Sequence, residues 1–189
     1  FVFGSVGKGT TLLSQRRPGD ELDILGPLGV PFRYQGGFET AVIVAGGLGV
    51  APFPFLTDEL ERRKLNVLTF VGSRSAIDIG VLHLSNVLRA TDDGSRGFKG
   101  TVVECLTDYL ATHSVERLKI FGCGPTRMLS VLSEIAQTRG LACELSLEGD
   151  MACGIGICQG CPVEKKNGAK KYALVCTDGP TFDCRDIIL

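Results

Sequence analysis

The sequence predicts an α/β protein in which a parallel sheet is covered by helices. Short apolar runs, typical of buried parallel strands, alternate with segments of helical periodicity. Two of these runs, residues 41–45 and 118–121, end in a glycine-rich turn that leads into a helix. Strands and helices that alternate in this way form βαβ units, in which the strands are parallel.

The segment before this sheet has weaker signals. Residues 1–10 read as a strand and a glycine turn, residues 8–13 as a loop entering a short helix, and residues 21–26 as a strand. A lysine, a glycine and two hydroxyl groups at a helix start can bind phosphate, although such a group is more often an ordinary cap. Because the chain begins at Phe1 rather than Met, we expect it to be N-terminally incomplete.

The first βαβ unit begins with the apolar run at residues 41–45, which is followed by a turn containing Gly46, Gly47 and Gly49. The next segment has the spacing of an amphipathic helix, and residues 66–71 form the second strand. Further along the chain we expect a helix near residues 81–89, a strand at residues 101–103 and a short helix at residues 106–111.

The second clear unit is the strand at residues 118–121, followed by Gly122-Cys123-Gly124-Pro125 and a helix that ends near Gly140. Its apolar residues recur at helical spacing, at Met128, Val131, Leu132 and Ile135. Ligands of open parallel sheets bind at the carboxyl ends of the strands, where both glycine turns are expected. The first turn can therefore accept a pyrophosphate, with the second near a nicotinamide; each turn alone is equally consistent with a plain tight connection. Cys123 is either a small buried residue or a cofactor contact.

Four cysteines near the C-terminus have the spacing Cys-x4-Cys-x2-Cys, with a fourth cysteine after fourteen residues; they are Cys153, Cys158, Cys161 and Cys176. This is the plant-type ferredoxin pattern for a 2Fe-2S cluster. Glycines between the first three cysteines allow the loop to bend and its N–H groups to approach sulfur. A structural zinc site remains the alternative, but zinc modules usually pair their cysteines in short knuckles.

Composition limits the other functions. The chain has 189 residues, 44% hydrophobic and 22% charged, with a formal net charge of −1. Nucleic-acid binding needs concentrated Lys and Arg, so we expect no nucleic-acid partner. Glycines and prolines interrupt the longest apolar stretch, residues 41–56, so we expect no membrane partner.

No signal peptide is visible, and thiolate chemistry favours a reducing cytoplasm. No set of nucleophile, base and orienting group is apparent, so we expect no catalytic side chain.

These motifs together resemble the electron-transfer subunit of dihydroorotate dehydrogenase type B, a flavoprotein similar to ferredoxin-NADP reductases. The segments that carry the resemblance are GKGT, LGPLG, VAGGLGVAP, FGCGP, LEGDMACGIGICQGC and VCTDGPTFD. The resemblance implies three units: the end of a FAD-binding β-barrel at 1–38, a NAD-binding α/β domain at 39–145 and a 2Fe-2S domain at 146–189. It also implies an FMN-containing catalytic partner in a heterotetramer for pyrimidine biosynthesis. Electrons would pass from dihydroorotate through that FMN, the cluster and FAD to NAD+.

The resemblance also assigns residues. The cluster ligands would be the four cysteines named above, and FAD would lie at Gly9, Thr10 and Thr11. The nicotinamide cofactor would lie at the two glycine turns, that is at Gly46, Gly47, Gly49, Cys123, Gly124 and Pro125. The Arg-x-Tyr-Ser flavin motif is not in this sequence, so the FAD site would be incomplete in this chain.

Several alternatives stay open. Arg74 follows the second strand, where a cation favours NADP, and neither Gly72 nor Ser73 is acidic; NAD is implied by the resemblance alone. A related small subunit, of a sulfide dehydrogenase or of a bifurcating NADH-dependent ferredoxin-NADP reductase, would share the fold. Four cysteine ligands favour the dihydroorotate family. A zinc-stabilised binding module without redox function is the alternative from another class.

Overall fold

The computed structural model describes residues 2–78 and 83–189. In chain order, the elements of the described residues are α1 (Lys8–Ser14), β1 (Thr40–Gly46), the 3-10 helix η1 (Gly47–Val50), α2 (Phe53–Arg62), β2 (Asn66–Ser73), the 3-10 helix η2 (Ala76–Asp78), β3 (Val87–Thr91), β4 (Phe98–Lys99), α3 (Val102–Thr112), β5 (Leu118–Cys123), α4 (Thr126–Thr138), β6 (Ala142–Ser146), β7 (Pro162–Glu164), β8 (Tyr172–Leu174) and β9 (Thr181–Asp183).

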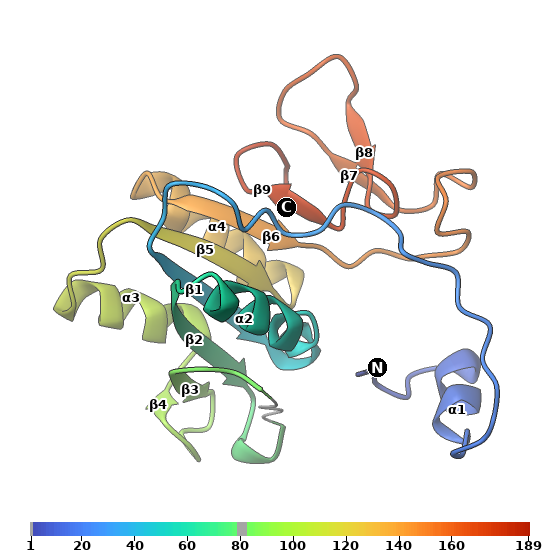
Figure 1. Ribbon diagram of the computed structural model, residues 1–189, viewed down its shortest axis with the longest axis horizontal. Coiled ribbons are helices and arrows are strands. Elements are labelled where there is room, and N and C mark those ends of the chain that lie inside the picture. The colour runs from blue at the N-terminus through green and yellow to red at the C-terminus, as the bar shows by residue number, and fades with distance from the viewer. Residues whose placement is uncertain (1, 79–82) are drawn as a thin grey trace.

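Seven of the strands in the described chain form one sheet, in the order β4-β3-β2-β1-β5-β6-β9 (Figure 1). All neighbours are parallel except β6 and β9, which are antiparallel. The predicted α/β class with a parallel sheet is therefore confirmed. The strand order reverses between β1 and β5, so the crevice at their carboxyl ends is the topological switch point where such sheets bind ligands.

Two apolar cores lie on opposite faces of the sheet. One contains α2, with Phe53 and Leu60 fully buried, and it packs against Phe121 of β5. The other contains α3 and α4, with Leu106 and Leu132 fully buried, and continues into the C-terminal unit. The central strand β1 has apolar side chains on both faces and is almost completely buried, as expected for a parallel strand covered on both sides.

The C-terminal unit is tied to the sheet at two places. Strands β7 and β8 form a small hairpin, and β9 then returns to pair with β6 at the edge of the large sheet. The chain before β1 also reaches this unit, because Val30 forms an isolated bridge with Pro180. The segment that precedes the sheet and the cysteine-containing unit therefore contact each other directly.

The predicted helices and strands of the two βαβ units are present, but the face of α4 differs from the prediction. Leu132 is buried as expected, whereas Val131 is 42% exposed. Leu129 and Ala136 complete the buried face in its place. The side of α4 that packs against the sheet is therefore the one that carries Leu129, Leu132 and Ala136, and Val131 lies outside it.

The predictions for residues 81–111 are partly wrong. Residues 87–89 belong to strand β3 and not to a helix, and residues 81–82 lie outside the described residues. Residues 101–103 are the start of helix α3 and not a strand. Thr101 caps this helix, because its hydroxyl accepts from the Glu104 N–H at 3.2 Å while the Glu104 carboxylate accepts from the Thr101 N–H at 2.7 Å. This capping box outweighs the β-branched residues at 101–103.

The strands expected before the sheet are also absent from the described residues. Residues 2–6 and 21–26 have no strand conformation, whereas the short helix predicted at residues 8–13 is present as α1. A strand needs a partner for its backbone groups, and no described strand lies beside residues 21–26. Among the helices that the structure describes, none combines the length and the apolar character needed to cross a membrane.

Candidate cluster and nucleotide sites

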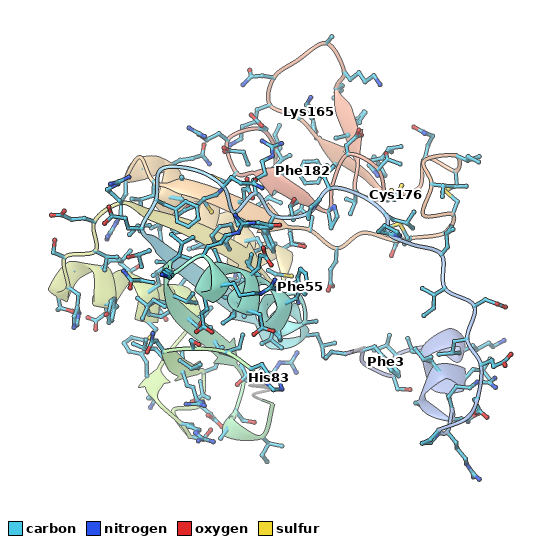
Figure 2. The ribbon with its side chains drawn as sticks, in the orientation of Figure 1. Phe3, Phe55, His83, Lys165, Cys176 and Phe182 are labelled. Atoms are coloured by element: carbon cyan, nitrogen blue, oxygen red, sulfur yellow. The ribbon has the colours of Figure 1, made fainter. Side chains whose placement is uncertain are left out.

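The four predicted cluster ligands lie in two contacting pairs. In the first pair, the Cys158 N–H donates to Cys153 Sγ at 3.4 Å. In the second, the thiols of Cys161 and Cys176 share a hydrogen bond, and both side chains are buried. The charge of Cys153 also contributes to raising the pKa of the Cys176 thiol, so the two pairs lie within electrostatic range of each other. Figure 2 shows Cys176 beside the segment that leads from α1 to the sheet.

Backbone amides of the loop point at sulfur. The N–H groups of Cys158, Ile155 and Ile157 lower the pKa of Cys153 to about 6, with the Cys158 N–H as the largest cause. The Gly160 N–H also donates to Cys158 Sγ at 3.4 Å. The loop therefore stabilises negative charge on sulfur. Burial has the opposite effect on Cys176, whose thiol pKa is raised, first by desolvation and then by the Cys161 thiol.

Two glycines give the loop its shape. Gly154 and Gly156 have φ angles of +73° and +81°, a region that side chains rarely adopt. A Cβ at Gly156 would lie 3.0 Å from Thr177 Cγ2, and one at Gly154 would lie 3.1 Å from Leu28 Cδ1. The loop is therefore packed between the turn after Cys176 and the segment that precedes the sheet.

The donor set fits a 2Fe-2S cluster. Each of two irons takes two ligands, which corresponds to two pairs of thiols with amides directed at sulfur. Nothing in residues 2–78 or 83–189 brings three His, Cys, Asp or Glu side chains together as a ready single-ion site.

The structure brings the two predicted glycine turns together. Gly46 ends β1, and a Cβ there would lie 2.9 Å from Pro125 Cδ. Gly49, in η1, approaches the end of β5 so closely that a Cβ would lie 2.3 Å from the carbonyl oxygen of Cys123. A Cβ at Gly124 would lie 3.0 Å from the Gly46 nitrogen. The turns thus form one continuous surface at the switch point, and Gly47, with φ +55°, lies on it with open space around its Cα.

Cys123 lies beneath this surface. Its side chain is buried, and burial raises the pKa of its thiol to about 11, with a further contribution from the negative charge of Glu148. A hydrogen bond with Ser146 opposes this increase. The group is therefore a neutral thiol at physiological pH, and its backbone carbonyl is what fixes the position of Gly49.

Helix α1, which carries Gly9, Thr10 and Thr11, stands apart from the sheet (Figure 1) and has no buried residue. The Thr10 hydroxyl accepts from the Val6 N–H at 2.9 Å. The hydroxyls of Thr11 and Ser5 share a 3.3 Å hydrogen bond. The structure does not bring this group to the cluster loop or the glycine turns.

Sequence reasoning missed a charged contact on the α2 face of the sheet. Lys119 of β5 donates to Glu144 of β6 at 3.1 Å and to the carbonyl oxygen of Arg33 at 2.6 Å. The Arg33 N–H donates to the other Glu144 oxygen at 2.8 Å. The signal was a lysine and a glutamate inside otherwise apolar strands. These contacts hold the segment before β1 against the sheet.

A second missed group lies at the end of β3. The Asp92 N–H donates to the Ser73 carbonyl at 3.1 Å, and the Asp93 N–H to the Arg74 carbonyl at 3.2 Å. Two aspartate residues therefore lie beside the end of β2, where the sequence of β2 itself has no acidic residue.

Comparison with known proteins agrees with this geometry. Residues 148–188 match the family described as the iron-sulfur cluster binding domain of dihydroorotate dehydrogenase B. The whole chain is 36% identical to 74% of the dihydroorotate dehydrogenase B (NAD(+)) electron transfer subunit of Geobacillus thermodenitrificans. It is 35% identical to 73% of the subunit of the same name in Desulforamulus reducens.

A solved NADH-dependent reduced ferredoxin-NADP oxidoreductase, studied for flavin-based electron bifurcation, superimposes with a TM-score of 0.85. It is 28% identical, and the alignment covers 98% of this chain and 67% of that one. The chain therefore belongs to the family of electron-transfer subunits of dihydroorotate dehydrogenase B.

Proposed function

We propose that this chain carries electrons from the FMN of a dihydroorotate-oxidising catalytic subunit, through a 2Fe-2S cluster and FAD, to NAD+. The observation that carries the proposal is the arrangement of four cysteines as two thiol pairs with amides directed at sulfur. A bound cluster supplies one-electron transfer. The assignment of Cys153, Cys158, Cys161 and Cys176 as its ligands is part of this proposal.

The loop's own residues have two tasks in this function. The N–H groups of Cys158 and Gly160 donate toward sulfur and so stabilise the reduced, more negative state. Burial of Cys161 and Cys176 keeps water from one side of the site. Together these effects set the potential at which the site accepts an electron.

The two glycine turns are proposed to bind the nicotinamide dinucleotide. Their backbone N–H groups can face a pyrophosphate, and the contact of Gly49 with the Cys123 carbonyl fixes the spacing of the two turns. We propose that FAD lies at Gly9, Thr10 and Thr11. Hydride transfer belongs to the cofactors, so the protein only has to orient them.

The organisation into a flavin-binding remnant (1–38), a NAD domain (39–145) and a cluster domain (146–189) is part of the proposal. So is the FMN-containing partner in a heterotetramer. We place the complex in the cytoplasm, because eight free cysteines and an iron-sulfur site suit a reducing compartment.

The experiment is to express the full-length gene with the neighbouring flavoprotein subunit and to follow dihydroorotate-dependent reduction of NAD+. Cys158→Ser should abolish this reduction and lower the iron content. Cys105→Ser is the matched control, because Cys105 is buried in α3 and lies outside the cysteine loop. Equal activity of the two variants would show that Cys158 is not a ligand. Absence of NADH formation with an active partner would exclude the proposed function.

A second function is favoured by the TM-score of 0.85 to the bifurcating reductase. In that case the chain would be the small subunit of a ferredoxin-NADP oxidoreductase or a related sulfide dehydrogenase. The partner's reaction separates the two functions. Reduction of NAD+ by NADPH that depends on oxidised ferredoxin as a second electron acceptor, and not on dihydroorotate, would establish the second. Zinc without iron or acid-labile sulfide in anaerobically purified protein would instead establish the non-redox binding module.

A further inference from the structure

A cavity of about 910 Å3 opens between helices α3 and α4. Its volume lies within the range of sites that hold small molecules and cofactors, about 300–1,000 Å3. Its polar and charged lining comes from the end of β3, from α3 and from the first turn of α4, namely Asp92, Thr101, Glu104, Thr107, Asp108 and Arg127. Apolar side chains such as Met128 and Val131 line the remainder, which suits the flat face of a base.

This cavity adjoins the proposed dinucleotide site. Pro125, which belongs to the second glycine turn, lines it. The same Pro125 packs against Gly46 of the first turn. On the other side, a Cβ at Gly72 would lie 2.6 Å from Val102 Cβ, so the start of α3 touches the end of β2. A dinucleotide whose pyrophosphate lies at the glycine turns can therefore extend one half into this cavity.

The charged groups of the lining are mostly acidic. It carries the carboxylates of Asp92, Glu104 and Asp108 against the single guanidinium of Arg127. The Glu104 carboxylate is held in the capping box of α3, and the hydrogen bond from the Thr101 N–H lowers its pKa, so it stays ionised. Asp92 takes part in no ion pair among the described residues. Its side chain is exposed and lines the cavity, so its charge is available to whatever occupies it.

Arg74 would favour NADP instead, because a cation after the second strand attracts the 2′-phosphate of NADP. Its side chain is exposed, and it does not line the cavity. Asp92 stands next to it in space, since its N–H donates to the carbonyl of Ser73. A carboxylate at this place accepts hydrogen bonds from ribose hydroxyls and repels a 2′-phosphate, which carries nearly two negative charges.

We propose that Asp92 makes the site select NAD over NADP, with the adenosine half of the dinucleotide in the cavity between α3 and α4. This inference rests on the proposed nucleotide-binding function. It names Asp92, directly after strand β3, as the specificity residue, although sequence reasoning looked for an acidic residue at the end of the second strand.

The test is to titrate the full-length protein, in its complex, with NADH and NADPH and to compare the dissociation constants. The wild-type protein should bind NADH at least tenfold more tightly. Asp92→Asn should reduce this ratio about tenfold, mainly by tighter binding of NADPH, since removal of one nearby charge at an effective dielectric near 20 is easily a factor of ten. Asp92→Glu keeps the charge and should keep the preference.

Asp93→Asn is the matched control. The Asp93 carboxylate accepts from the Ser95 N–H at 2.8 Å and from the Ser95 hydroxyl at 2.6 Å, and it does not line the cavity. Its removal should leave the NADH to NADPH ratio unchanged. A wild-type preference for NADPH, or the same ratio in Asp92→Asn and in wild type, would overturn the assignment of Asp92 alone. Failure of the wild-type protein to bind either nucleotide would overturn the nucleotide-binding function as well.

Discussion

The contact between the two glycine turns can be tested with Gly49→Ala. The added Cβ would lie 2.3 Å from the Cys123 carbonyl oxygen, 2.5 Å from its carbon and 2.6 Å from the Gly124 nitrogen. Ordinary van der Waals contact begins at 3.4 Å, so the turns must separate by 3.4 − 2.3, or about 1.1 Å. All three atoms belong to the backbone, and no side-chain rotation can relieve the overlap.

Two effects of different size are expected. Overpacking of this kind costs about 1–3 kcal/mol of folding free energy. A displacement of about 1 Å between groups that position one ligand costs about a hundredfold in function. We therefore expect a modest loss of stability but a drop of about a hundredfold in NADH-dependent reduction of an artificial electron acceptor, measured with the full-length protein.

Gly122→Ala is the matched control for stability. A Cβ at Gly122 would lie 2.7 Å from the side-chain ends of Leu132 and Leu145, and its nearest neighbours are side chains of the α3 and α4 core rather than the backbone of the first glycine turn. It should lower the unfolding free energy by a similar amount and leave NADH turnover within a few-fold of wild type. If Gly49→Ala retained wild-type turnover, or if Gly122→Ala lost as much, the spacing of the turns would not control nucleotide binding.

Three further predictions concern other parts of the molecule. Cys158→Ser should remove the visible absorption and most of the iron while the thermal unfolding of the sheet, followed by far-UV circular dichroism, persists; full iron content would contradict the ligand assignment. Lys119→Met should lower the free energy of unfolding, measured by chemical denaturation, by about 3 kcal/mol, because it leaves the nearly buried Glu144 carboxylate without its cation. The double variant Lys119→Met with Glu144→Gln should recover part of that loss. If the two substitutions had additive effects, the two side chains would not be coupled. A hydrogen bond from Arg185 lowers the pKa of Asp183 below its usual 3.8. The pair therefore stabilises the folded state above about pH 4, and this stabilisation is lost as the pH falls through the lower pKa of the folded state. Arg185→Gln should flatten the pH dependence of the unfolding free energy in that acidic range, and an unchanged profile would refute the pairing.

Local patterns were sufficient for the central part of the fold. The run at residues 41–45 is apolar on both faces, as expected for a covered parallel strand, and the run at residues 118–121 is apolar apart from Lys119. Each run is followed by a glycine turn. The segment at residues 101–103 misled the prediction because its β-branched residues resemble a strand. The capping pattern of Thr101 and Glu104 was nevertheless visible in the sequence and identifies the helix start correctly.

Apart from the meeting of the two glycine turns, contacts between distant segments could not be predicted. The cysteine spacing predicts four ligands, but their grouping as Cys153 with Cys158 and Cys161 with Cys176 depends on how the loop folds over the distant turn after Cys176. Asp92 is eighteen residues beyond Arg74, and only the pairing of β2 with β3 brings the two together. For the same reason the acidic lining of the cavity was not visible in the sequence.

The proposed cluster and nucleotide sites are joined by a short series of rigid contacts. The cluster loop packs against Leu28, and Gly29, with φ +71°, lets the next residues approach the turn at Gly179. Val30 then accepts a 2.7 Å hydrogen bond from the Thr181 hydroxyl of β9.

From β9 the series continues through the sheet itself, because β9 pairs with β6 and β6 with β5, which ends at Cys123 beneath the nucleotide turns. Each step is a backbone pairing or a close packing contact, so a change at one end cannot be absorbed by a flexible linker. The separation between the proposed cluster site and the proposed dinucleotide site is therefore a property of the folded chain.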